Sequence, residues 1–146
     1  MKILMFFAIG ILAGSLITLQ SVLNAGLGQK TGNLGSVLVL TCVSILVLLL
    51  LILLFPTTAN FKQIPGISEW YLYIGGVLGV GILAAPIFLI PRIGATSTLT
   101  ALVVGQLFLA LFIDHFGLFH FPRIEISATR ILGIVCLIFG ALLIKK

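Results

Sequence analysis

The chain has 146 residues, of which 61% are hydrophobic and only 8% are charged. A water-soluble domain of this length could not bury so much apolar surface, so the composition excludes a soluble protein and indicates an integral membrane protein. The formal net charge of +5 does not indicate nucleic-acid binding, because the Lys and Arg residues stand scattered between apolar runs, as residues that anchor helix ends at lipid headgroups do.

Five apolar segments, each near the ~20 residues that cross a bilayer, follow one another along the chain. They cover about 3–23, 36–55, 69–90, 94–116 and 128–144. The first resembles a secretory signal, but four more follow it, and we interpret it as an uncleaved transmembrane helix. The connections are short, so we predict an all-α polytopic membrane protein in which residues 1–146 form a single domain of five transmembrane helices.

Small residues repeat at helical spacing on four of these segments. Such stripes let the backbones of neighbouring helices approach closely. They comprise Gly10 and Gly14 in the first segment, Gly75 and Gly79 in the third, Gly94, Thr98, Ala101 and Gly105 in the fourth, and Thr129, Gly133, Cys136 and Gly140 in the fifth. The second segment has no stripe, and its residues 45–55 are aliphatic and aromatic without a break. We therefore expect a compact bundle with the second helix at its lipid-facing periphery.

Two prolines fall in or beside the third segment. Pro86 lies within the predicted helix and removes one backbone hydrogen bond, which predicts a kink. Pro91 is expected to end this helix just before Arg92.

The fourth segment carries a polar seam. At 100° per residue, four polar side chains fall within one arc of about 120°: Thr96, Thr100, Gln106 and Asp114. Gln106 lies about 18 Å from Gly94 at 1.5 Å per residue, near the middle of a ~30 Å bilayer. A polar group at that depth needs a hydrogen-bonding partner or a water-filled cavity.

The first helix brings further polar side chains to a similar depth. If the membrane face at which the chain starts is side A, the first helix ends and the fourth begins at the opposite face, side B. We predict a cavity open toward side B that binds a small polar solute through hydroxyls and carboxamides: Gln20, Asn24, Thr96, Thr100 and Gln106. In the alternative, these groups hydrogen-bond across helices and only hold the bundle together.

Asp114 falls about 30 Å along its helix from Gly94, at the side A interface rather than in the membrane core. In one interpretation it forms an ion pair with Arg123 or Arg130. In the other it couples transport through protonation, with His115 as a helper. Arg92, near side B, is a further candidate for coupling or for an ion pair.

No pattern in the sequence indicates catalysis or a metal site. An intramembrane hydrolase needs a Ser–His pair or two facing carboxylates, whereas the side chains of the consecutive Asp114 and His115 diverge by about 100°. Cys42 and Cys136 have no His or carboxylate at metal-ligand spacing. We therefore predict a protein that is not an enzyme and binds no cofactor and no metal.

The distribution of Lys and Arg favours neither orientation in the membrane. Side A receives Lys2, Lys62, Arg123 and Arg130, and side B receives Lys30, Arg92, Lys145 and Lys146. An excess of Lys and Arg in cytoplasmic loops orients membrane proteins, so this balance is consistent with insertion both ways up. Two inverted copies would then reproduce the inverted repeats of secondary transporters. In the alternative, one strong feature such as the first helix sets a single orientation.

Several motifs resemble the YdcZ-like family of small five-span bacterial proteins in the drug/metabolite transporter superfamily. They are Gln20 and Asn24, PRIGATSTLTALVVGQL at 91–107, IDHFG at 113–117, and Arg130 with the Leu132-Gly133 pair that follows. The resemblance covers essentially the whole chain. It implies a five-helix half-transporter in a bacterial-type inner membrane, which completes itself by pairing with an inverted copy or a sister protein. It carries over no established substrate residues.

These observations lead to two hypotheses of different kinds. In the first, the chain is a transporter subunit that moves a small polar organic solute as an antiparallel, dual-topology homodimer in the lipid bilayer. In the second, it is a non-transporting membrane scaffold or accessory subunit of a larger complex. Gln106 and Asn24 discriminate between them, because a cavity wall keeps these amides wet and a scaffold pairs them off.

Overall fold

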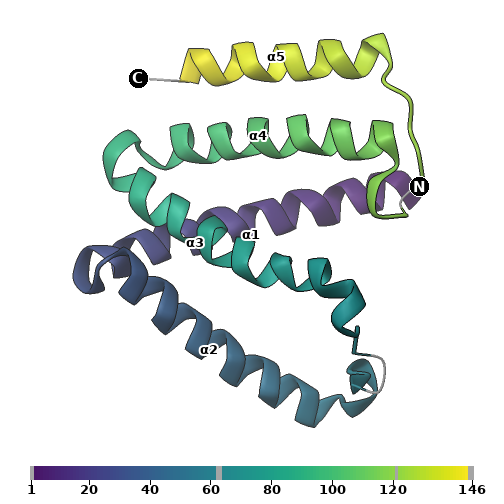
Figure 1. The fold of residues 1–146 in the computed structure, drawn as a ribbon. Coiled ribbons are helices and arrows are strands. Elements are labelled where there is room, and N and C mark those ends of the chain that lie inside the picture. The colour runs from purple at the N-terminus through teal and green to yellow at the C-terminus, as the bar shows by residue number, and fades with distance from the viewer. Residues whose placement is uncertain (1, 62–63, 121, 145–146) are drawn as a thin grey trace. The chain divides into compact units, whose positions relative to one another are not determined.

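The computed structural model describes residues 2–61, 64–120 and 122–144. Within these ranges the chain is helical and contains no strand (Figure 1). The five α-helices are α1 (Lys2–Thr31), α2 (Asn33–Leu54), α3 (Ile74–Ile93), α4 (Ala95–Phe116) and α5 (Ala128–Ile144). Short 3₁₀ helices lie between them: η1 (Pro56–Thr58), η3 (Ile67–Tyr73) and η4 (Leu118–His120). The prediction of an all-α fold with five helices is confirmed.

Four helices of the described chain are long and apolar enough to cross a membrane. They comprise Ile3–Thr31, Asn33–Leu54, Ile67–Ile93 and Ala95–Phe116. The fifth, Ala128–Ile144, is a shorter apolar helix of 17 residues. At 1.5 Å per residue it is about 26 Å long, close to the ~30 Å thickness of the hydrocarbon core. The chain is a polytopic membrane protein.

Three helix boundaries differ clearly from the sequence prediction. The α-helix of the third segment begins at Ile74 and not near residue 69, because Ile67–Tyr73 form the 3₁₀ helix η3. α1 does not end near residue 23 but continues to Thr31, because no residue leaves the helical conformation before Gly32. The prediction that Pro91 ends the third helix is wrong, since α3 continues to Ile93 with both Pro86 and Pro91 inside it. A proline removes its own N–H donor and does not prevent the residues after it from continuing the helix.

Two single glycines turn one long helix directly into the next. Gly32 (φ 77°, ψ 162°) separates α1 from α2, and Gly94 (φ 81°, ψ 161°) separates α3 from α4. Only glycine adopts this region readily, because a side chain there is strained. Four residues after each corner stands a fully buried hydroxyl residue, Ser36 or Thr98, whose backbone N–H donates to the corner carbonyl at 2.9 Å or 3.2 Å, respectively.

The chain divides into two compact units, Met1–Pro91 and Arg92–Lys146. In the first unit, α1 and α2 pack where they meet at Gly32 and diverge from that corner (Figure 1). The Ser36 hydroxyl donates to the Asn24 carbonyl at 3.1 Å and ties the two helices together. Ile87 of α3 is buried, and a Cβ atom added to Gly28 of α1 would collide with its side chain.

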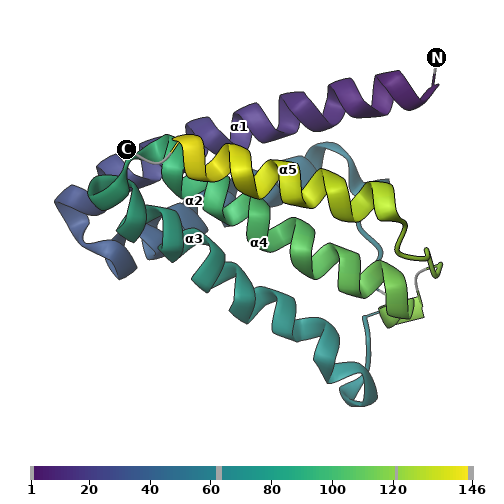
Figure 2. The ribbon, with the colours of Figure 1, turned by 90° about the horizontal axis from the view of Figure 1, so that it is seen from above.

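The second unit is an antiparallel pair of helices. α4 and α5 lie side by side in both views (Figures 1 and 2). Gly117 (φ 61°) ends α4 in the left-handed conformation, and its N–H donates to the Ile113 carbonyl. The connecting loop folds back onto the helix end, where the Ile124 N–H donates to the Asp114 carbonyl at 2.8 Å.

The glycine stripes remain uncovered in the described chain. A Cβ atom added to any of these glycines meets nothing within 4 Å: Gly10, Gly14, Gly75, Gly79, Gly105, Gly133 and Gly140. Within each of the two units, these glycines therefore make no close helix contact. Exposure also fails to single out α2 as the lipid-facing helix, because large apolar side chains are exposed on all five helices.

Candidate functional site

A cavity of about 510 Å³ lies between the beginning of α4 and the end of α5. Seven residues line it: Arg92, Ile93, Ser97, Thr100, Ala101, Ala141 and Leu142. Arg92, Ser97 and Thr100 are the polar members of this lining, and the other four residues are aliphatic. Few polar groups in an otherwise apolar concave surface are typical of small-molecule sites.

Two hydroxyls of α4, those of Thr98 and Thr100, are bonded within their own helix. The Thr100 hydroxyl donates to the Thr96 carbonyl at 2.7 Å, and the Thr98 hydroxyl donates to the Gly94 carbonyl at 2.8 Å. In the described chain these hydroxyls do not hold α4 to another helix, in contrast to the interhelical bond of Ser36. Because a hydroxyl that donates its proton can still accept, the Thr100 oxygen remains able to bind a solute donor in the cavity.

The structure brings together only some of the residues singled out in the sequence. Thr100 lines the cavity, whereas Thr96 and Gln106 are exposed and do not. Arg92, predicted as a candidate for coupling or for an ion pair, lines the same cavity. The contribution of α5 was missed, because Ala141 and Leu142 carry no polar signal in the sequence.

The two predicted α1 residues lie in the first unit and differ in exposure. Gln20 is exposed, while Asn24, one turn later, is buried where α2 packs against α1. The backbone carbonyl of Asn24 accepts the hydrogen bond from Ser36. The structure therefore places Asn24 at the α1–α2 corner, and its role as a solute contact stays a prediction.

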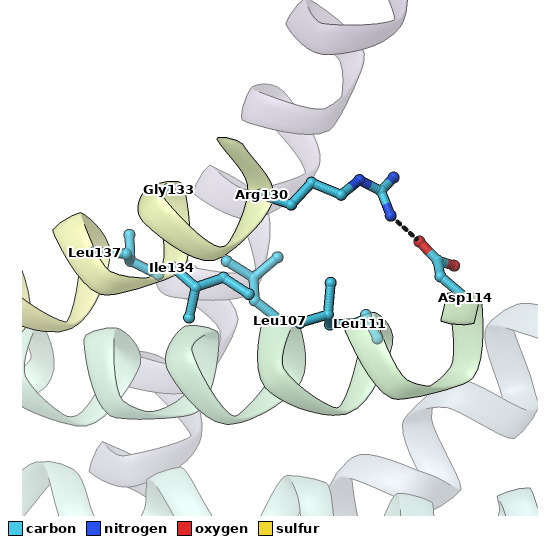
Figure 3. A pocket seen from close by; sticks show the side chains of 8 residues that line it. Leu107, Leu111, Asp114, Arg130, Gly133, Ile134 and Leu137 are labelled. Atoms are coloured by element: carbon cyan, nitrogen blue, oxygen red, sulfur yellow. Dashed lines mark hydrogen bonds and ion pairs between the residues drawn. The ribbon is translucent and has the colours of Figure 1, made fainter. Parts of the chain in front are cut away.

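An ion pair lies at the other end of the second unit. Arg130 Nη1 of α5 contacts Asp114 Oδ2 of α4 at 3.2 Å, and both side chains are only partly exposed, at 38% and 37% (Figure 3). Of the two partners that the sequence left open, the structure pairs Asp114 with Arg130. The pair stands at the end of an apolar cavity of about 290 Å³, lined also by Leu107, Ala110, Leu111, Gly133, Ile134 and Leu137.

His115 follows Asp114 but does not line this cavity. Its ring packs edge-on against Phe116 with a centroid separation of 5.0 Å. Its Nδ1 atom is buried and has no hydrogen-bonding partner among the described residues. The geometry therefore links His115 to an aromatic neighbour and not to the ion pair.

The described residues contain no group of three His, Cys, Asp or Glu that could hold a metal ion. Cys42 and Cys136 are exposed and unbonded to each other.

Comparison with known proteins gives one match. The model of the family described as "Putative inner membrane exporter, YdcZ" matches residues 5–143. No curated protein and no solved structure matches the chain. The matched residues thus cover α2, α3 and α4 and nearly all of α1 and α5, and they include the cavity at Arg92 and the ion pair at Asp114.

Proposed function

Because the chain belongs to the YdcZ family of inner membrane exporters, it is a multi-pass membrane transporter, and we propose that it moves a small polar organic solute as one half of an antiparallel dimer. The membrane would be the inner membrane of a bacterial-type cell. The partner would be a second, inverted copy or a sister chain.

The observation that carries the choice of solute is the cavity of about 510 Å³ between α4 and α5. Its volume falls within the ~300–1,000 Å³ of small-molecule sites. Arg92 offers charge-assisted hydrogen bonds to an anionic or strongly polar group, and Ser97 and Thr100 offer hydroxyl oxygens. The aliphatic remainder suits a carbon skeleton, so a small polar organic molecule matches the lining better than a bare ion.

The dimer is supported by the open glycine stripes. Small residues on transmembrane helices allow close backbone contact, yet the stripe glycines of α1 and α3 (Gly10, Gly14, Gly75 and Gly79) meet nothing within 4 Å in the described chain. A second chain is the partner that such faces are suited to. The balance of Lys and Arg between the two membrane faces favours an inverted copy.

A substitution of Thr100 by Val tests the site. The hydroxyl donates only within its own helix, so Thr100→Val should leave the thermal stability nearly unchanged while it removes an acceptor from the cavity. A neutral hydrogen bond contributes about 0.5–1.5 kcal/mol, so we expect the dissociation constant of the solute to rise about 2- to 13-fold. The solute is first found by a thermal-shift screen against metabolite classes, since a ligand at 100 times its Kd adds about 2.7 kcal/mol. The control is Thr96→Val, because Thr96 is exposed outside the cavity.

Thiol labelling tests the same cavity without a known solute. In a variant with Cys42→Ala and Cys136→Ala, Thr100→Cys should react with a small water-soluble maleimide much faster than Leu109→Cys, which lies on the exposed apolar surface of α4. A Thr100 thiol as inert as the Leu109 thiol would contradict a hydrated site and favour the scaffold hypothesis. A reactive thiol that transported solute protects would support transport.

A further inference from the structure

A long apolar groove follows the seam between α4 and α5. The cavity beside the Asp114–Arg130 pair meets a second cavity, of about 400 Å³, at Leu137, which lines both. The second cavity is lined by Leu99, Thr100, Val103, Cys136, Leu137, Gly140, Ala141 and Ile144. We name the two cavities together the seam groove. Along α5 it extends from Arg130 to Ile144, which is about 21 Å at 1.5 Å per residue.

The form of the seam groove fits a hydrocarbon chain. Its length exceeds half of the ~30 Å hydrocarbon core, which is the reach of one lipid leaflet. Gly133 and Gly140 form recesses in its wall, because a Cβ atom on either would meet nothing within 4 Å. Figure 3 shows the aliphatic side chains Leu107, Leu111 and Ile134 between the two helices, with the ion pair at one end. A compact polar solute would leave most of this apolar length unused.

The ion pair suits a headgroup that carries both charges. Arg130 and Asp114 share a single contact at 3.2 Å, through one guanidinium nitrogen and one carboxylate oxygen. A guanidinium has further N–H donors and a carboxylate has a second oxygen, so each partner retains bonding capacity. A phosphate can accept from the remaining N–H groups of Arg130, and a primary ammonium can donate to Oδ1 of Asp114.

The depth of the ion pair is that of lipid headgroups. Asp114 stands about 28 Å along α4 from Ala95, near the end of a ~30 Å hydrocarbon core. A purely anionic headgroup would meet the Asp114 carboxylate without compensation. A trimethylammonium group has no N–H with which to bond that carboxylate.

From this geometry we propose that the seam groove binds one membrane phospholipid with a zwitterionic headgroup that contains a primary ammonium, of the phosphatidylethanolamine type. Its phosphate bonds Arg130, its ammonium bonds Asp114 and one acyl chain lies along the α4–α5 seam. The seam groove shares Thr100 and Ala141 with the solute cavity at Arg92, whereas the ion pair that would bind the headgroup lies at the other end of the groove. The headgroup proposal therefore does not depend on the transported solute.

Lipid binding to the purified full-length protein tests the proposal by native mass spectrometry. Phosphatidylethanolamine, phosphatidylcholine and phosphatidylglycerol with identical acyl chains are titrated separately. We expect one phosphatidylethanolamine per chain, bound about tenfold more tightly than the other two, since a hydrogen bond to a charged group is worth about 1.5–3 kcal/mol. Asp114→Asn should abolish the preference for phosphatidylethanolamine over phosphatidylcholine.

Two substitutions on α5 separate the groove from the rest of the helix surface. Gly133→Leu fills the recess and should weaken phosphatidylethanolamine binding at least tenfold. Leu132→Phe adds bulk at the neighbouring position, which is 62% exposed and outside the groove, and should bind like the wild type. Circular dichroism of each variant checks that the helices are retained.

Three outcomes would overturn the proposal. Equal affinity of the wild-type protein for all three lipids would exclude headgroup recognition, whatever the variants do. Undiminished binding to a helical Gly133→Leu variant would exclude the seam groove. Binding of free phosphoethanolamine as tightly as of the whole lipid would show that the ion pair recognises a soluble zwitterion and that the groove holds no acyl chain.

Discussion

Gly28 of α1 is buried and lies directly against Ile87 of α3, whose side chain is 1% exposed. A methyl group at Gly28 would meet a Cγ2 atom that cannot move away, because Ile87 is branched at Cβ and enclosed. Overpacking of this kind costs about 1–3 kcal/mol. Replacement of glycine by alanine gains up to ~1 kcal/mol of helix propensity, which offsets only part of that cost.

We therefore predict that Gly28→Ala lowers the thermal stability of the protein in detergent. Gly26→Ala is the matched control, because a Cβ atom there meets nothing within 4 Å, and it should be neutral or stabilising. Ile87→Ala in the Gly28→Ala background should recover part of the loss. Equal stability of the two alanine variants would refute the α1–α3 contact.

For single residues, the sequence predicted a contact correctly only for the oppositely charged pair Asp114 and Arg130. The distance of Asp114 from the helix start put it at the membrane interface within reach of Arg130, and the structure has that contact. For the solute cavity, periodicity gave Thr100 and Gln106 one common face. It could not tell which part of that face α5 covers, because the packing angle of a neighbouring helix depends on contacts far away in the sequence. The role of Gln106 as a solute contact stays a prediction.

At the scale of the helix, hydrophobicity predicted all five elements and the exact bounds of α5. It did not predict how far a helix continues once the apolar run ends. The polar residues at the end of α1 are compatible with a helix, so only the positive φ of Gly32 stops it. Proline disfavours the interior of a helix. Near a helix end, however, it costs one hydrogen bond, and α3 continues past Pro91.

The glycine stripes give a prediction that belongs to the helix. Gly79 of α3 is half-buried and a Cβ atom on it meets nothing within 4 Å, so Gly79→Leu should leave the fold of one chain intact. If the stripe packs against a second chain, the same change should weaken the dimer at least tenfold, because the helices can no longer approach. Circular dichroism measures the first effect and cross-linking in membranes measures the second.

The control for this experiment lies on α2. Leu53→Phe adds bulk at a position that is 79% exposed, and it should change neither helicity nor dimer. Ile52, chosen from sequence alone as a silent position, is half-buried and serves less well. If Gly79→Leu and Leu53→Phe form cross-linked dimers equally well, the stripe on α3 is not part of the dimer interface.

At the scale of the whole molecule, the prediction about orientation in the membrane depends on the distribution of Lys and Arg in the sequence alone. Lys62, Lys145 and Lys146, which contribute to the charge balance, lie outside the described residues. The single-domain organisation and the antiparallel dimer likewise remain proposals, since a chain's own periodicity says nothing about how its second copy sits.

We predict that a reporter fused after residue 146 is active on both faces of the membrane, because neither face carries an excess of Lys and Arg. Two or three Lys residues added beside Lys2 should force one orientation and abolish transport. Co-expression with a variant that carries the extra Lys beside Lys30 should restore it. A single orientation of the unmodified protein would falsify dual insertion.

The one-residue corners at Gly32 and Gly94 also affect which parts of the chain are exposed to the aqueous compartment on each side of the membrane. If each helix crosses the membrane once, both corners fall on the same face, and that face receives no loop between α1 and α4. The long connections, residues 55–66 and 117–127, would then fall on the opposite face. In an antiparallel pair, each compartment would therefore meet the loops of one copy and the bare corners of the other. An epitope inserted into residues 56–66 would then be exposed once per dimer on each face of the membrane. An antibody added to one side should therefore bind one epitope for every two chains.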